Sequence, residues 1–354
     1  MFIYILFFLA FVLVSLCEWI NKNKIATNLL CIFLIIGLSL LVALRVDVGT
    51  DYSSYVRIFE KVTSFYSSDY SGLEAGFISS ISLFKSIGLN VNSYFGFFSF
   101  LPLMMIYYVS TKETKYLAIV MLIYFSDLFF YYNLSGFRQS IAMGFVFLSF
   151  IFIRDKNPWR FIFTILVSAL FHKPAIVSLI LYPMVCRLSH RFFYFTCLLI
   201  PIVIQVIIGF GFFDIIDSLS YFRNTSLYVS DGYNNSDIMN MLKGTIKRSF
   251  PIILLFIMMI MKLEYKNVFK SSVFKIYFLA LVTYCSLYFS YPDLTVRLTS
   301  YWFVFMPLTI AIIFEYVKQK FQLFFLLLIF SYSFLSLYVY LCLDVYQYKT
   351  IGIF

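Results

Sequence analysis

A series of long, nearly uncharged apolar segments recurs along the chain and limits what it can fold into. A helix needs about 17–25 mostly apolar residues to cross the hydrocarbon core of a bilayer. Helices also satisfy their own backbone hydrogen bonds, which lipid cannot do for them. We therefore predict an all-α polytopic integral membrane protein. The predicted spans are 2–20, 29–44, 92–110, 117–133, 138–153, 192–209, 249–261, 276–291, 298–314 and 321–343.

The composition excludes several classes of protein. Of the 354 residues, 62% are apolar and 12% are charged. A soluble domain has about 45–50% apolar and about 25% charged residues. This difference excludes a soluble enzyme, a disordered chain and a secreted disulfide scaffold, and the unbroken apolar runs differ from the alternation of a transmembrane barrel. The six Cys residues lie in or beside the spans, so we expect neither a disulfide framework nor a metal site. We predict one transmembrane domain over residues 1–354.

Segment 161–186 allows two interpretations. It is long and mostly apolar, but His172, Lys173 and Pro174 interrupt its middle. Proline removes a backbone donor and clashes with the preceding helical turn. The segment is therefore either one long kinked span or a hairpin of two short helices.

The distribution of basic residues favours the hairpin. With a hairpin and an outside N-terminus, six loops face the cytoplasm and hold 15 of the 27 Lys and Arg residues. The positive-inside rule predicts such an excess. One long span would instead place Arg187 and Arg191 outside. The hairpin gives about 11–12 transmembrane segments, with large outside loops 45–91 and 210–248. The six cytoplasmic loops are 21–28, 111–116, 154–160, 186–191, 262–275 and 315–320.

Three separated spans begin or break at the predicted outer side with a basic residue, namely Arg138, His172 at the hairpin tip, and Arg297. Arginine at a helix end often extends to lipid headgroups. However, a cation gains nothing at a helix N-terminus, where the dipole is already positive. No carboxylate lies within four residues of Arg138 in the sequence. A bound anion would explain the arrangement, because the guanidinium fork matches phosphate geometry.

Two outer segments carry acidic residues with both a structural and a functional interpretation. Asp51 follows Arg45 and Gly49 near the start of the first outside loop, where it can cap a helix or belong to a site. Segment 74–88 has the pattern of an amphipathic helix at the outer interface. Glu74 lies at its start, where the helix dipole favours a carboxylate and a substrate contact is the alternative.

Five short motifs follow one another between residues 45 and 301. They are Arg45-x3-Gly49-x-Asp51 with Tyr55 and Phe59; Glu74-x-Gly76-Phe77; Asn133 with Arg138-Gln139-x-x-Ala142; Phe171-His172-x-x-Ala175; and Arg297-Leu-x-x-Tyr301. With these motifs in this order, the chain resembles the EpsG-like branch of Wzy-type polysaccharide polymerases, which includes O-antigen polymerases. Region 210–248 contains no motif that matches the family.

The resemblance implies a glycosyltransferase reaction at the outer face of the bacterial cytoplasmic membrane. An undecaprenyl-pyrophosphate-linked glycan would donate its sugar chain to a hydroxyl of another lipid-linked repeat unit of O-antigen, capsule or exopolysaccharide. The implied partners are these two glycans and membrane lipid, with a chain-length regulator protein as a further candidate. No cofactor, metal or nucleic acid is implied.

The outer-face residues can be assigned roles in such a reaction. Attack by a hydroxyl needs a base, and the lipid pyrophosphate needs cations. The candidate bases are His172, Asp51 and Glu74. The candidate pyrophosphate and substrate ligands are Arg138, Arg297, Gln139, Asn133 and Arg45, the last either as a third cation or as a partner that orients Asp51.

Other membrane functions remain as alternatives. A lipid-linked oligosaccharide flippase or another transporter would be expected to carry charged groups near the middle of the membrane. The predicted spans carry almost none, with Asp127 as the exception. An O-antigen ligase or a membrane acyltransferase would share the outer Arg and His residues.

Overall fold

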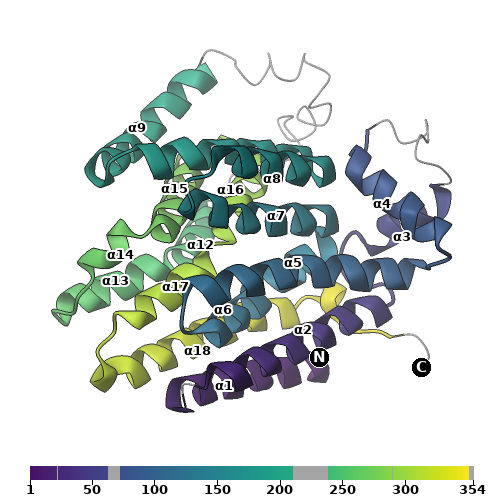
Figure 1. Ribbon diagram of the computed structural model, residues 1–354, viewed down its shortest axis with the longest axis horizontal. Helices are drawn as coiled ribbons and strands as arrows, with labels where there is room; N and C mark the ends of the chain where they lie inside the picture. Colours follow the sequence, from purple (N-terminus) through teal and green to yellow (C-terminus); the bar gives the residue numbers. More distant parts are fainter. Residues whose placement is uncertain (22, 63–71, 210–237, 289, 351–354) are drawn as a thin grey trace.

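The computed structural model describes residues 1–21, 23–62, 72–209, 238–288 and 290–350. These residues form a bundle of helices that lie side by side along the long axis of the molecule (Figure 1). Apart from helices and loops, the described part contains one isolated bridge between Arg45 and Thr350. The all-α prediction is therefore confirmed.

By length and composition, six helical segments can cross a membrane. They are α1 (Phe2–Asn21), α2 (Lys24–Leu44), α5 (Val91–Glu113), α6 (Leu117–Ile123) continued by the π-helix η2 (Tyr124–Ser135), α7 (Phe137–Arg154) and α18 (Gln319–Leu341). A seventh is the pair α16 (Pro292–Phe303) and α17 (Met306–Glu315), bent by 43°. Four shorter apolar helices are α8 (Pro158–Phe171), α9 (His190–Gly209), α13 (Phe250–Ile260) and α15 (Ser272–Leu287).

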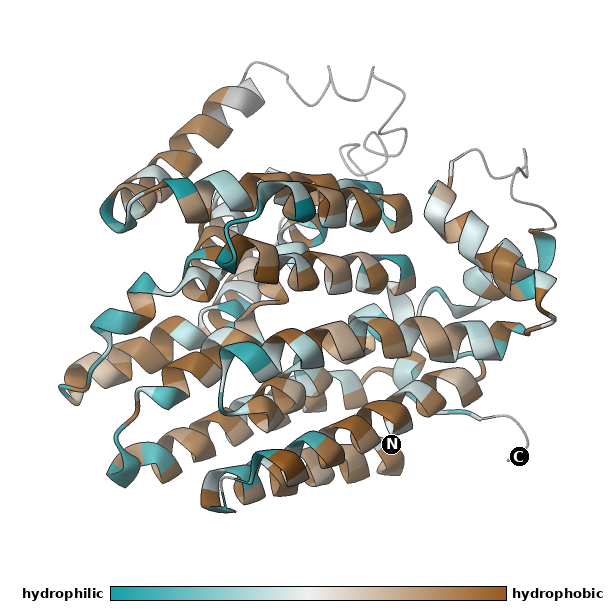
Figure 2. Ribbon diagram, viewed as in Figure 1, coloured by the Kyte–Doolittle hydropathy of each residue, from teal (hydrophilic) through white to brown (hydrophobic). Residues whose placement is uncertain are grey.

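The outer helices expose large apolar side chains over much of their length. Phe33 of α2 is 73% exposed and Leu335 of α18 is 63% exposed. Apolar residues dominate these helices (Figure 2). A surface of this kind is stable against lipid hydrocarbon and would be unfavourable in water.

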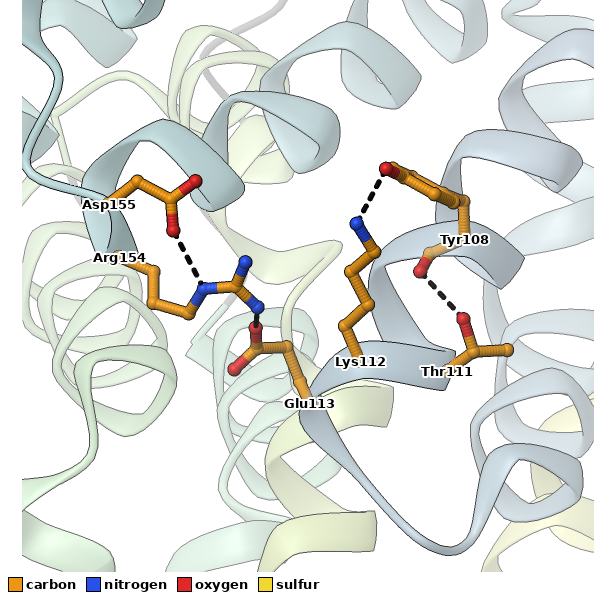
Figure 3. Close-up of polar contacts among 6 residues, drawn as sticks. All are labelled: Tyr108, Thr111, Lys112, Glu113, Arg154 and Asp155. Atoms are coloured by element: carbon orange, nitrogen blue, oxygen red, sulfur yellow. Dashed lines mark hydrogen bonds and ion pairs between the residues drawn. The ribbon is translucent and has the colours of Figure 1, made fainter.

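The loops predicted to face the cytoplasm gather at one end of the bundle, on the left in Figure 1. We call this the basic end. There, Arg154 pairs with Glu113 at 2.7 Å and with Asp155 at 3.1 Å (Figure 3). The Glu315 carboxylate accepts a hydrogen bond from the backbone N–H of Lys115 at 2.6 Å. These contacts join loops that lie up to 200 positions apart in sequence.

The chain reverses direction at His172, so the hairpin interpretation is confirmed. Ser168, near the end of α8, donates to the carbonyl of Ala142 in the first turns of α7. Cys186, after the reversal, donates to the carbonyl of Ile153 at the other end of α7. The returning limb consists of η3 (Lys173–Ile180) and η4 (Pro183–Arg187). One long kinked span would have carried Cys186 away from Ile153.

Two short helices cover the other end of the bundle, which we call the site end and which lies on the right in Figure 1. They are α3 (Tyr52–Lys61) and α4 (Ala75–Ser86), the latter confirming the helix expected near 74–88. Gly76 lets α4 approach the end of α8, because a Cβ there would lie 2.8 Å from the Cβ and the carbonyl oxygen of Leu170. Lys85 donates to the carbonyl of Glu60 at 2.8 Å, which joins α4 to α3.

Two predicted spans differ from the structure. The span at 249–261 is preceded by a further helix, α12 (Ile238–Arg248), which is joined to α13 at Ser249. Each helix is about 16 Å long, so neither alone crosses a hydrocarbon core of about 30 Å. The span at 298–314 begins earlier, at Pro292, and bends between α16 and α17. Residues 63–71 and 210–237 of the expected outside loops lie outside the described residues.

Candidate functional site

An ion pair between Glu74 and Arg138 lies at the site end. Glu74 occupies the N-cap position of α4, and Arg138 is the second residue of α7. Glu74 also accepts a hydrogen bond from the backbone N–H of Lys173 at 3.3 Å. The Glu74 side chain is 8% exposed and that of Arg138 is 24% exposed. Glu74 is thus the anion that offsets the charge of Arg138 at its helix N-terminus. The local sequence could not show this pairing because the two residues are 64 positions apart.

His172 lies beside this ion pair, at the tip of the hairpin. Its extended backbone, with φ of −154°, separates α8 from η3, and Pro174 follows two residues later. The imidazole Nδ1 forms a hydrogen bond with the hydroxyl of Tyr301 on α16. The charges of Arg138 and Arg297 both act on the His172 ring. The structure therefore brings His172, Glu74, Arg138 and Arg297 into one cluster.

Gln139 joins α7 to α16 behind this cluster. Its side-chain amide donates to the backbone carbonyl of Arg297 at 3.0 Å and to the Ser300 hydroxyl at 2.5 Å. The Gln139 side chain is buried. These bonds fix the position of the turn of α16 that carries Arg297 and Tyr301 relative to Arg138.

Tyr55 of α3 covers the Arg138 side chain from the other side. Its hydroxyl interacts electrostatically with the Arg138 guanidinium, and its ring packs against Phe77 and Phe137 with centroid separations of 5.9 and 5.8 Å. Burial raises the pKa of Tyr55, so the hydroxyl stays protonated beside the cation. Asp51 is exposed at the start of α3, and its charge acts on the Tyr55 hydroxyl. Asp51 thus lies at the rim of the cluster.

Two further candidate residues lie apart from the cluster. Arg45 is completely buried and donates to the backbone carbonyls of Leu134 at 2.7 Å and Asn133 at 3.3 Å. These carbonyls end the helix η2, where a cation is favoured by the helix dipole. The Asn133 side chain accepts from Tyr124 at 2.8 Å and donates to Ser99 at 3.0 Å. In this structure Arg45 contacts the end of η2, and the expected contact that orients Asp51 is not formed.

The loop after α2 is fixed from two sides. Gly49 has a φ of +98°, and a Cβ there would overlap the carbonyl oxygen of Leu134, so only glycine fits. Its N–H donates to the carbonyl of Val345 at 2.9 Å, and the N–H of Val46 donates to that of Lys349 at 2.9 Å. The segment after α18 therefore holds the loop that carries Asp51.

Sequence reasoning missed Lys247 and Arg248, the last two residues of α12. Lys247 forms an ion pair with Asp127, which also accepts a hydrogen bond from Tyr332 at 3.2 Å. The charge of Arg248 acts on Tyr132. The one signal in the sequence was the Lys-Arg pair directly before an apolar span, which the sequence interpretation assigned to an outside loop.

A groove of about 580 Å³ lies between α2 and α5, away from this cluster. Apolar side chains of Ile36, Leu40 and Phe100 line it together with the polar residues Asn90 and Ser93. None of the candidate site residues lines the groove. The cluster and the groove are therefore separate features of the surface.

The sequence profile described as the EpsG family matches residues 28–350. The chain belongs to the EpsG family. The matched range contains all five motifs and every residue of the cluster, and it supports a polysaccharide polymerase-like membrane protein. No curated protein and no solved structure matches the chain.

The cluster combines cations, a carboxylate and a base-type side chain in a small volume. The guanidinium groups of Arg138 and Arg297 suit a phosphate-bearing ligand, because each fork donates parallel hydrogen bonds. The imidazole of His172 and its Tyr301 partner suit transfer of a proton. Within the described ranges, no group of three His, Cys, Asp or Glu residues lies close enough to bind a metal ion.

Proposed function

We propose that this protein polymerises undecaprenyl-pyrophosphate-linked oligosaccharide repeat units of a surface glycan such as O-antigen, capsule or exopolysaccharide. The donor glycan is transferred from its lipid pyrophosphate to a hydroxyl of a second lipid-linked repeat. The protein is a multi-pass component of the bacterial cytoplasmic membrane, and the site end faces away from the cytoplasm. The excess of Lys and Arg residues in the loops of the basic end supports this orientation.

One observation carries the proposal: Arg138, Arg297, His172 and Glu74 converge at one end of the bundle although they lie on four separate elements. A lipid pyrophosphate leaving group needs positive charge at its oxygens as the bond to the sugar breaks. A hydroxyl nucleophile needs a base. The cluster contains two arginines and a histidine, which are side chains of these two kinds, and this supports the proposal.

In the proposed reaction, the acceptor hydroxyl oxygen forms a bond to C1 of the donor sugar. The bond between C1 and the pyrophosphate oxygen breaks, and its electron pair leaves with the lipid pyrophosphate. The proton of the acceptor hydroxyl passes to Nε2 of His172. This role requires Nδ1–H of His172 to donate to the Tyr301 oxygen, because Nε2 then carries the free lone pair.

Glu74 and Asp51 have different roles in this proposal. Glu74 accepts hydrogen bonds from Arg138 and from the backbone of Lys173, so it positions the cation next to the His172 tip. Asp51, which is exposed at the rim, binds hydroxyls of the arriving glycan in this proposal. The Gln139 side chain donates to the backbone carbonyl of Arg297 and so holds Arg297 in position relative to Arg138.

Deletion of the gene, followed by gel analysis of the surface glycan, tests the proposal. Loss of a polymerase leaves one repeat unit on the final acceptor, and plasmid-borne wild-type protein restores the ladder. A flippase or ligase deletion would remove the glycan from the final acceptor altogether, and an acyltransferase deletion would leave chain length unchanged. Either of those two results would overturn the proposal.

A further inference from the structure

Helix α12 exposes several apolar side chains together with Lys243, whereas the last two residues of the helix, Lys247 and Arg248, turn toward other helices. Ile238 and Ile246 are each 63% exposed and Leu242 is 47% exposed. Lys247 and Arg248 instead contact residues of other helices. Helices α12 and α13 follow one another, and α13 continues toward the basic end. Lys247 and Arg248 are the last residues of α12, about 16 Å from its start, so they lie near the middle of the combined α12–α13 segment.

The two cations of α12 are not equivalent. Lys247 is neutralised by Asp127. Among the described residues, no carboxylate forms an ion pair with Arg248. A charged side chain deep in a membrane bundle is costly unless it has a partner or a ligand. The positive charge of Arg248 is therefore left without an anion in the described part of the protein.

The Arg248 side chain is held in a fixed position. Its guanidinium lies over the rings of Tyr284 and Phe303, at 4.3 and 5.3 Å from their centroids. One Nη1–H donates to the carbonyl of Gly244 at 3.2 Å. A Cβ at Gly244 would overlap the Tyr284 hydroxyl, so glycine permits this close packing. The contacts pre-organise the guanidinium, and its other N–H donors form no hydrogen bond within the described ranges, so they are available to a ligand there.

Arg248 lies near the cluster described above but separate from it. The charge of Arg248 acts on the Tyr132 hydroxyl. The Tyr301 hydroxyl instead experiences the charges of Arg138 and Arg297, with Tyr132 also acting on it. Tyr301 and Tyr132 thus have different cationic neighbours.

We infer that Arg248 is a second diphosphate subsite, which binds the headgroup of a lipid diphosphate whose chain lies along the exposed face of α12. The inference rests on the proposed function, because joining two lipid-linked repeats brings two diphosphates to the protein at once. Arg138 and Arg297 hold one of them, and Arg248 holds the other. The apolar residues Ile238, Leu242 and Ile246 favour a lipid-borne diphosphate over a free one.

Binding of farnesyl diphosphate to the purified full-length protein in nanodiscs tests this inference by isothermal titration. We expect two bound equivalents for the wild type and one for both Arg248→Met and Arg138→Met. The matched control is Lys243→Met, which removes an exposed cation from the same helix and should retain both equivalents. Arg248→Lys preserves the charge inside the bundle and should weaken the second site at least tenfold, because the planar fork is lost.

Several outcomes would overturn the inference. Retention of both equivalents by Arg248→Met would show that Arg248 binds no diphosphate. Loss of an equivalent in Lys243→Met would show a general charge effect. Equal binding of inorganic pyrophosphate and farnesyl diphosphate at the Arg248 site would exclude the lipid chain from recognition. If the glycan ladder survived gene deletion while Arg248→Met still lost one equivalent, the proposed function would fail and the diphosphate site would stand.

Discussion

Glu74 and Arg138 form an ion pair between the start of α4 and the start of α7, although 64 positions separate them in sequence. The pair leaves Arg138 with its charge compensated before any ligand arrives. A diphosphate that binds Arg138 must therefore compete with Glu74. The same carboxylate also accepts from the backbone of Lys173, next to His172. A ligand that displaces Glu74 would thus alter the surroundings of the imidazole as well.

The role of Arg138 as a bidentate ligand predicts sensitivity to lysine. We expect Arg138→Lys to insert at normal levels yet lose most polymerisation, with Arg138→Ala only slightly worse, because lysine keeps the charge but not the fork. Glycan gels and membrane immunoblots measure both properties. Arg154→Lys at the basic end is the control and should polymerise normally. If Arg138→Lys gave the same glycan ladder as the wild type, Arg138 would contact lipid headgroups instead of binding the diphosphate.

Competition by Glu74 predicts a gain in binding when its charge is removed. Glu74→Gln should bind farnesyl diphosphate roughly fivefold more tightly, because an ion pair worth about 1 kcal/mol no longer opposes the ligand. Glu113→Gln breaks an ion pair of the basic end and should leave affinity unchanged. Titration in nanodiscs measures both. Weaker binding by Glu74→Gln would show that Glu74 supports the ligand instead of competing with it.

His172 is expected to matter for reaction and little for insertion. His172→Ala should reach normal membrane levels and lower the polymerisation rate by about 100-fold or more, which leaves single-repeat glycan. Tyr301→Phe removes the hydroxyl that orients Nδ1 and should cause a smaller loss. His190, the other histidine of the chain, lies at the basic end, so His190→Ala is the control. Normal chain lengths from His172→Ala would make His172 a helix breaker only.

The packing of α4 on α8 predicts a position-specific effect of alanine. Gly76→Ala should destabilise this packing by about 1–3 kcal/mol, because the added Cβ meets the backbone of Leu170. The ion pair of Glu74 should weaken with it and polymerisation should fall. A Cβ at Gly72 would meet no other atom within 4 Å, so Gly72→Ala should behave like the wild type. Thermal melts of the purified proteins compare the two, and equal midpoints would contradict the prediction.

The hairpin and the positive-inside rule together predict which side each end faces. In a chain with its native cysteines replaced, Ser189→Cys at the basic end should react only with thiol reagents that enter the cytoplasm. Ser86→Cys, at the end of α4, should react with impermeant reagents in intact cells. Both serines are exposed. Labelling of Ser189→Cys from outside would invert the orientation and place the cluster on the cytoplasmic side.

The positions of most helices could be predicted because they depend on local properties. Hydrophobicity sets the spans, and the proline after His172 together with Arg187 and Arg191 was enough to indicate the hairpin. Helix α12 was missed because its apolar positions are interleaved with Lys, Asn, Gly and Thr. Such a mixture has low hydrophobicity on average, and its apolar face becomes evident only once the helix is folded.

The cluster was predictable in part for a different reason. His172, Glu74 and Arg138 are ionisable residues at a break or start of a helix in an otherwise apolar chain, so their residue types alone indicate candidate site residues. Their partners were not predictable, since pairing depends on the three-dimensional arrangement of α4, α7 and the hairpin. Arg45 shows the limit of such reasoning. Its charge stabilises carbonyl groups at the end of η2, 88 and 89 positions away, and the sequence contains no sign of that contact.

The anchoring of the α2 loop by the segment after α18 sets an order of events during synthesis. Tyr348 donates to the carbonyl of Leu41 and Thr350 to that of Leu44, and each bond spans more than 300 positions. At about 5–20 residues per second, the ribosome needs on the order of 15–60 s to make the intervening chain. During that interval α1 and α2 are already in the membrane while the loop after Arg45 lacks its final neighbours. The loop that carries Asp51 can therefore reach its final position only after α18 and the segment that follows it have been made.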